Sequence, residues 1–214
     1  TRRTLPRNIS STTWTQPDDI FHATCELDSH ADTCVAGPNC RIIEYTNQVV
    51  EVSAFSKEHS ILQDVPIVTA ATAYDDPTNG TTYILILGQA IYMGNKVDAT
   101  LLCPNQLRYN GLTVDDVPVH LSPPNRPSTH SIHCVDDDLV LPLSLQGIIS
   151  YFHTRTPTQE ELDTCRWITL TNESQWDPHS LSFQEQEENA KDIHNLHYTN
   201  RLDRSINACS RHQN

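Results

Sequence analysis

Three ionisable side chains lie close together at one end of an apolar segment near the N-terminus. Asp28, His30 and Asp32 follow the run Phe21–Leu27 and occupy alternate positions. If a β-strand continues through them, the three side chains project from one face. Ionisable groups on one face repel one another and lose solvation unless something uses or compensates them. We therefore treat this segment as the candidate site.

Two kinds of chemistry suit such a group, and a turn-capping role for Asp28 is the structural alternative. Two carboxylates that share one proton can activate a water for peptide hydrolysis, one acting as base and the other as acid. Carboxylate and imidazole groups also suit a metal ion. Alternate side chains of a continuous strand lie about 6.5–7 Å apart, which is wide for a shared ion. We expect no metal and no other cofactor.

Two blocks of sequence resemble a known family. The string Leu27-Asp28-Ser29-x-Ala31-Asp32-Thr33 resembles the apolar-Asp-Ser/Thr-Gly-Ala motif of retropepsins, the single-motif aspartic proteases of retroviruses and retrotransposons. Downstream, Val97–Leu107 followed by Gly111–Val114 is similar to the "Asn-Leu-Leu-Ser…Gln-Leu…Gly…Val" block of copia-type retrotransposon polyproteins. The order and separation of the two blocks agree with that family. The resemblance covers roughly residues 20–121.

The resemblance implies roles for the residues of the first block. Asp28 is the catalytic aspartate, and because the chain has one such motif, a symmetric dimer would supply the second carboxylate. Ser29 braces the two active loops across the dimer axis, and Asp32 hydrogen-bonds the substrate backbone. Substrate binding or dimer bracing thus falls to Ser29, Ala31, Asp32 and Thr33.

One residue departs from the family pattern. The family has Gly where this chain has His30, and Gly suits a position where substrate backbone passes close by. An imidazole there blocks the cleft, alters the flap geometry or adds a titrating group beside the aspartates. A packed, hydrogen-bonded imidazole is the structural alternative. We expect His30 to modulate whatever activity exists.

The sequence pattern predicts that the elements positioning these residues are short strands. Val65–Tyr74 and Thr81–Met93 flank a turn that contains Asn79-Gly80, which is a strong hairpin signal. The resemblance implies a flap that closes over the peptide, and we assign it to this hairpin. The expected flap residues are Tyr74, Asp75, Asn79 and Gly80.

The rest of the chain divides by composition. Residues 1–19 read as a polar arm, and residues 20–121 as a retropepsin-like closed barrel with the flap hairpin. Residues 122–175 follow the breaker cluster Ser122–Ser128 and read as a β-rich extension. Its short helix begins at the capping box Thr158–Glu161. Residues 176–214 read as a polar, partly helical tail. The expected fold class is mainly β.

Charge and cysteine content restrict partners and location. The chain of 214 residues has 14 Lys and Arg against 27 Asp and Glu, a formal charge of −13. This charge disfavours nucleic-acid and anionic-membrane partners. No apolar run reaches the length of a membrane-spanning helix. Seven cysteines cannot all pair within one chain, so reduced thiols and a cytoplasmic location are expected, with a virus-like particle as one setting. Three sequons, at Asn8, Asn79 and Asn172, leave secretion as the alternative.

The function expected from the residues and the resemblance is a retrotransposon-type aspartic endopeptidase. It would act as a homodimer on peptide bonds of its own polyprotein, through a water activated by two aspartates. The alternative is a protease-like domain that has lost catalysis and serves as a structural or self-assembling module. The His30 departure favours the second hypothesis, and the intact Asp-Ser-x-Ala-Asp string favours the first.

Overall fold

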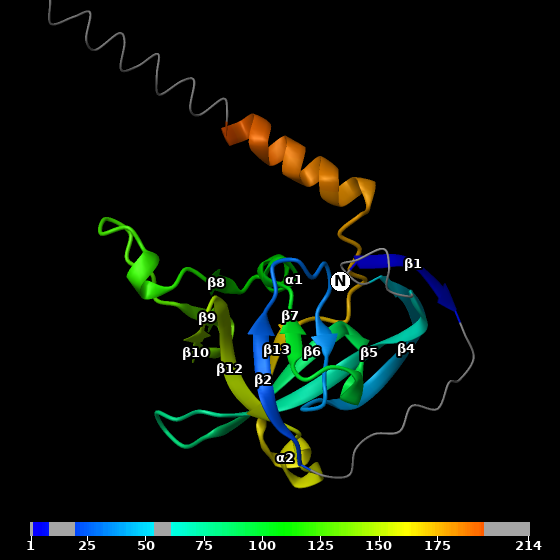
Figure 1. Ribbon diagram of the computed structural model, residues 1–214, viewed down its shortest axis with the longest axis horizontal. Helices are drawn as coiled ribbons and strands as arrows, with labels where there is room; N and C mark the ends of the chain where they lie inside the picture. Colours follow the sequence, from blue (N-terminus) through cyan, green and yellow to red (C-terminus); the bar gives the residue numbers. More distant parts are fainter. Residues whose placement is uncertain (1, 9–19, 54–60, 195–214) are drawn as a thin grey trace, which may run out of the picture. The chain divides into compact units, whose positions relative to one another are not determined.

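The computed structural model describes residues 2–8, 20–53 and 61–194, and strands dominate it (Figure 1). The strands are β1 (Arg2–Asn8), β2 (His22–Leu27), β3 (Val35–Ala36), β4 (Arg41–Ser53), β5 (Leu62–Asp75), β6 (Thr82–Tyr92), β7 (Thr100–Leu102), β8 (Thr113–Asp115), β9 (Ser131–Cys134), β10 (Leu139–Pro142), β11 (Ser144–Gln146), β12 (Ile149–Arg155) and β13 (Arg166–Thr171). Two short α-helices, α1 (Pro104–Tyr109) and α2 (Gln159–Thr164), and three 3-10 turns, η1 (Gly94–Lys96), η2 (Val119–Leu121) and η3 (Val135–Asp137), connect them.

The chain forms two compact units, residues 1–176 and residues 177–214. Residues 181–194 of the second unit are helical. The first unit contains a mixed sheet in the order β1-β4-β5-β12-β2-β7-β3-β6-β13 and a smaller sheet in the order β10-β9-β8. The prediction of a mainly β fold is confirmed.

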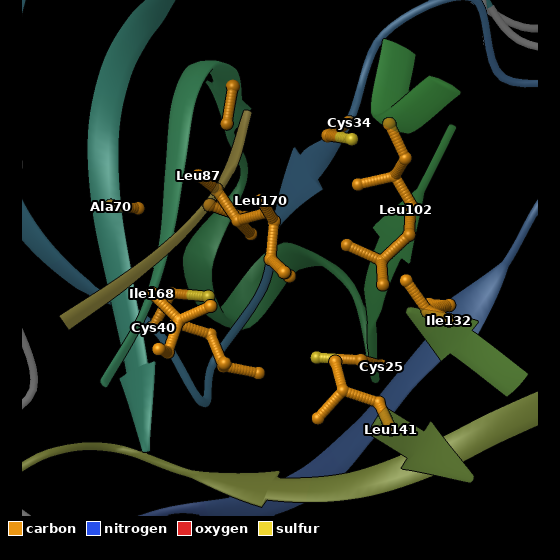
Figure 2. Close-up of a cluster of buried hydrophobic side chains, with 14 of the residues drawn as sticks. Cys25, Cys34, Cys40, Ala70, Leu87, Leu102, Ile132, Leu141, Ile168 and Leu170 are labelled. Carbon is orange, nitrogen blue, oxygen red and sulfur yellow. The ribbon is translucent and has the colours of Figure 1, made fainter. Parts of the chain in front are cut away.

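The large sheet returns on itself. Strand β5 pairs with β12 on one side and with β6 on another, through Arg155↔Ala73 and Ala73↔Ile84. The path of hydrogen-bonded strands therefore runs from β5 through β12, β2, β7, β3 and β6 back to β5. Apolar side chains from these strands and from the small sheet fill one buried cluster, part of which Figure 2 shows.

Segments beyond residue 121 take part in this sheet. Strand β12 pairs antiparallel with β2, and β13 pairs parallel with β6. The N-terminal arm also contributes a strand, because β1 pairs with β4. A polar strand such as β1 has no apolar alternation, so the sequence pattern did not reveal it.

Arg155, the last residue of β12, connects β12 with β5 and α2, and it lies opposite His22 at the start of β2. Its guanidinium donates to both carboxylate oxygens of Asp75, at 2.8 and 2.9 Å, and to both of Glu161, at 2.9 and 2.6 Å. Glu161 also completes the predicted capping box of α2 with Thr158. The hydrogen bonds from Arg155 lower the pKa of Glu161 from 4.5 to about 2, and they also lower the pKa of Asp75.

This cluster predicts a pH-dependent contribution to stability. A carboxyl group with a lowered folded-state pKa stabilises the fold above its unfolded value, and this stability disappears as the pH falls towards about 2. We expect Arg155→Met to lower the free energy of unfolding at pH 7 by about 1–2 kcal/mol, after allowance for solvent screening. The loss should shrink between pH 5 and pH 2, as urea unfolding at several pH values would measure.

The matched control is Arg166→Met, which removes the same charge from a more exposed pair with Asp137. Exposed pairs contribute little, so this variant should unfold like the wild type at every pH. A loss in Arg155→Met that stays constant down to pH 2 would contradict the assignment to the carboxylates.

Candidate active site

Asp28 lies in the loop that joins two strands bonded to the same neighbour. Strand β2 ends at Leu27 and pairs parallel with β7, and β7 also pairs with β3 through Val35↔Leu101. The backbone N–H of Asp28 donates to the carbonyl of Leu102 at 3.0 Å, and the N–H of Ala31 donates to the carbonyl of Asp28 at 3.2 Å. The main chain on both sides of the Asp28 side chain is therefore fixed.

The side chains of this loop do not share a strand face. Asp28 Oδ1 accepts a hydrogen bond from the N–H of His30 at 2.9 Å, which turns the chain after one residue. Ser29 and His30 are exposed, and Asp28 is half-buried. The condition for a shared face, a strand that continues through Asp32, is not met, because β2 ends at Leu27 and the chain turns at this side-chain bond. Asp28 performs the turn-capping role, with its carboxyl group near the surface.

The next three residues run inward from the loop. Ala31 and Thr33 are buried, and Asp32 is half-buried. The carbonyl of Asp32 accepts a hydrogen bond from the indole Nε1 of Trp176 at 2.7 Å. The Trp176 ring also packs against Tyr109 of α1, with 5.1 Å between ring centroids. The end of the first unit thus braces the Asp28 loop, a role for Trp176 that the sequence did not indicate.

Gln106 of α1 anchors the far side of the loop from inside the core. Its Oε1 accepts the N–H of Cys34 at 2.8 Å, and its Nε2 donates to the carbonyls of Gly88 and Gln89 at 3.5 and 3.4 Å. Cys103, which precedes α1, donates its N–H to the sulfur of Cys34 at 3.2 Å. A buried polar side chain with several backbone partners holds these segments in one arrangement.

The second block of sequence surrounds the first in space. Leu102 supplies the carbonyl that binds Asp28, and Leu107 and Val114 are buried in the same cluster. Gly111 ends α1 with a φ of 87°, a conformation that favours glycine. The sequence places Gln106 in this block but does not indicate its structural role, because a single buried Gln produces no periodic pattern.

A buried hydrogen-bond network connects β2, β7 and β12 with the segment that precedes β4. Thr100 donates to Asn39 Oδ1 at 2.6 Å, and the Cys40 sulfur lies 3.2 Å from the Thr100 hydroxyl. The Cys25 sulfur lies 3.3 Å from the hydroxyl of Thr154 on β12. Burial raises the pKa of Cys40 to about 11 and raises that of Cys25 as well. Burial and a raised pKa both disfavour the thiolate form of these two side chains.

The predicted β5–β6 hairpin is confirmed, and its turn lies away from Asp28. The turn closes with the N–H of Asp76 on the carbonyl of Thr81 at 2.9 Å. At its base Asp75 is bound to Arg155, whose strand partner is His22 at the start of β2. Asp28 follows the other end of β2. Figure 1 shows the turn and the Asp28 loop at different ends of this strand.

The four expected flap residues therefore do not meet Asp28 in this chain. Tyr74 is buried in the core, with its ring edge on Phe152, and Asn79 and Gly80 lie in the exposed turn. The Asn-Gly signal identifies a turn but not the end of the sheet at which it lies. The hairpin of β4 and β5 packs nearer the Asp28 loop, because Val52 and Val65 share a buried cluster with Val35 and Leu101.

Within the described part of the chain, no group of three or more His, Cys, Asp or Glu side chains is placed to hold a metal ion. The described helices include none that is long and apolar enough to cross a membrane. Comparisons with protein-family models, with curated proteins and with solved structures found no match. The function proposed below therefore rests on the residues of the site and their geometry.

Proposed function

We propose that this chain is a retrotransposon-type aspartic endopeptidase that acts as a homodimer on its own polyprotein. The observation that carries the proposal is the setting of Asp28, in a fixed loop between two strands that both pair with β7. The carboxyl group is half-buried and next to the exposed Ser29, so a second copy can approach it. Two such carboxyls at hydrogen-bonding distance share one proton and activate a water.

Two further features of the first unit support a barrel of retropepsin type. The strand pairing that returns to β5 is what a small closed barrel requires. The residues of the two resembling blocks lie next to each other, with Leu102 bound to Asp28 and Gln106 bound to Cys34. In this proposal the β4–β5 hairpin, rather than the β5–β6 turn, is the element beside the substrate.

One observation favours the alternative, a protease-like module without catalysis. His30 is exposed beside Asp28, and its backbone N–H occupies Asp28 Oδ1. The family has Gly at this position because substrate backbone passes close by, so an exposed imidazole here would obstruct a substrate. In this alternative the same fold assembles with copies of itself but does not cleave peptides.

The experiment compares wild-type protein with His30→Gly, each with and without pepstatin, on an unfolded protein as substrate. If His30 obstructs the cleft, His30→Gly should raise the rate of cleavage by about tenfold or more and move the pH optimum towards the acidic range of an unperturbed carboxylate pair. Pepstatin should inhibit both proteins. The matched control is His153→Gly, which changes another imidazole, on β12.

The outcomes separate the two functions. Cleavage that pepstatin inhibits, in either protein, supports the endopeptidase. If neither protein cleaves at any pH between 3 and 8 although both form dimers, the structural module is the correct function. An unchanged rate and pH profile in an active His30→Gly variant would show that the exposed His30 side chain lies outside the cleft.

A further inference from the structure

The hairpin of β11 and β12 ends beside the Asp28 loop. Strand β12 pairs antiparallel with β2, with Tyr151 opposite Glu26. Ile149 lies two residues beyond Tyr151 and Asp28 lies two residues beyond Glu26, so both follow the same end of this strand pair, and the turn at Gly147 comes just before Ile149. Figure 1 shows the start of β12 next to the end of β2. Whatever approaches the Asp28 loop closely also meets this hairpin.

The tip of this hairpin is apolar and exposed. Ile148 is 97% exposed and Ile149 is 43% exposed, whereas the next residue, Ser150, is buried. Two adjacent exposed isoleucines at the end of a hairpin lose contact with water only when another surface covers them. The outer edge of β11 is also open, because β11 pairs only with β12 among the described strands.

Two hydrogen bonds hold the base of the hairpin to His130. The hydroxyl of Ser150 lies 2.9 Å from Nε2 of the buried His130, and the carbonyl of His130 accepts the N–H of Leu143 at 2.9 Å. A hairpin held in this way presents its tip without an additional cost of ordering when a partner binds. It is a preformed contact surface.

The two-fold axis of the proposed function points to another copy of the chain as the partner of the hairpin tip. Each copy carries a net charge of −13, so copies repel each other and an uncharged surface suits a contact between them. Residues 139–150 contain no charged side chain. A two-fold axis that brings two Asp28 side chains together also brings the two uncharged hairpin tips towards the axis, since each tip and Asp28 follow the same end of the β2–β12 pair.

We infer that the tip of the β11–β12 hairpin, with Ile148 and Ile149, is the dimer contact that brings the two Asp28 carboxyls together. This inference rests on the proposed function for the identity of the shared site. The extension beyond residue 121 then supplies the interface, and each copy positions the catalytic loop of the other. The site is incomplete without the second copy.

The experiment measures dimer dissociation of the full chain by sedimentation over a concentration series. Ile148→Asp should raise the dimer dissociation constant at least about tenfold, because every dimer contains the substitution twice at a contact. The matched control is Ile20→Asp, at a residue 52% exposed before the start of β2. It should dimerise like the wild type. Thermal unfolding checks that both variants fold, as expected for substitutions at exposed positions.

Cleavage of an unfolded protein, with and without pepstatin, is measured on the same samples. Ile148→Asp should lose cleavage at low protein concentration and recover it at high concentration. Equal dissociation constants for wild type and Ile148→Asp overturn the inference and leave the endopeptidase intact. A weaker dimer in Ile148→Asp, together with a wild-type dimer that does not cleave, overturns the proposed function and supports the interface. A wild type that stays monomeric, or a change in KM with unchanged dimerisation, also overturns the inference.

Discussion

Asp28→Asn should lower the rate of peptide hydrolysis by at least about a thousandfold, because an amide cannot take a proton from the attacking water. The substitution keeps the local structure, since the side-chain oxygen of Asn can still accept the N–H of His30 that Asp28 Oδ1 accepts now. The loss should appear in kcat and be the same in the His30→Gly background. Dimerisation and thermal stability should stay close to those of the wild type.

The control for this prediction is Asp163→Asn, which makes the same change at an exposed position on α2. Its cleavage rate should equal that of the wild type. Residual cleavage by Asp28→Asn that pepstatin still inhibits would place the catalytic carboxylate elsewhere in the chain. A variant that loses activity only because it unfolds would show a lower midpoint of thermal unfolding, and this would contradict the expected retention of the turn.

Gln106→Leu should lower the free energy of unfolding by about 2–4 kcal/mol. Leucine fills a similar volume but leaves the buried N–H of Cys34 without the acceptor that Gln106 Oε1 provides at 2.8 Å. It also removes the donor to the carbonyls of Gly88 and Gln89. At about 2–4 °C per kcal/mol for a chain of this size, the unfolding midpoint should fall by roughly 10 °C. Calorimetry measures this directly.

Asn105→Leu is the matched control, because Asn105 precedes Gln106 in the same helix and is exposed. Among the described residues, its side chain accepts one long hydrogen bond, of 3.3 Å, from Arg108. The midpoint should change little. If both variants unfold alike, Gln106 is not the residue that connects the Asp28 loop to the core, and the buried network contributes less than its contacts suggest.

Local features of the fold could be predicted from the sequence because their causes are local. The capping box Thr158–Glu161 begins α2, and the segments around Asn79-Gly80 form the β5–β6 hairpin. Phe21–Leu27 contains β2. In each case the side chains that determine the element lie within a few residues of it.

The arrangement around Asp28 could not be predicted in the same way. The hydrogen bond from the N–H of His30 to Asp28 Oδ1 turns the chain directly after β2, so the alternate spacing of Asp28, His30 and Asp32 does not give them a shared strand face. The position of the β5–β6 turn in the sheet depends on contacts between residues far apart in sequence. These are the pairing of β12 with β5 and the ion pair between Arg155 and Asp75. The brace from Trp176 to Asp32 spans 144 residues. No periodicity within a segment reports such contacts.

The pairing of β2 with β12 and the brace from Trp176 have a consequence for the order of events during synthesis. Strand β2 is made early, but its neighbour β12 follows more than a hundred residues later, as the contact between Cys25 and Thr154 across 129 residues illustrates. Contacts of such long range form slowly because a long loop must close first. On a ribosome, the Asp28 loop can reach its final arrangement only after residue 176 has emerged. Under the proposed function, a polyprotein that contains this chain would therefore not cleave itself before its synthesis had passed residue 176.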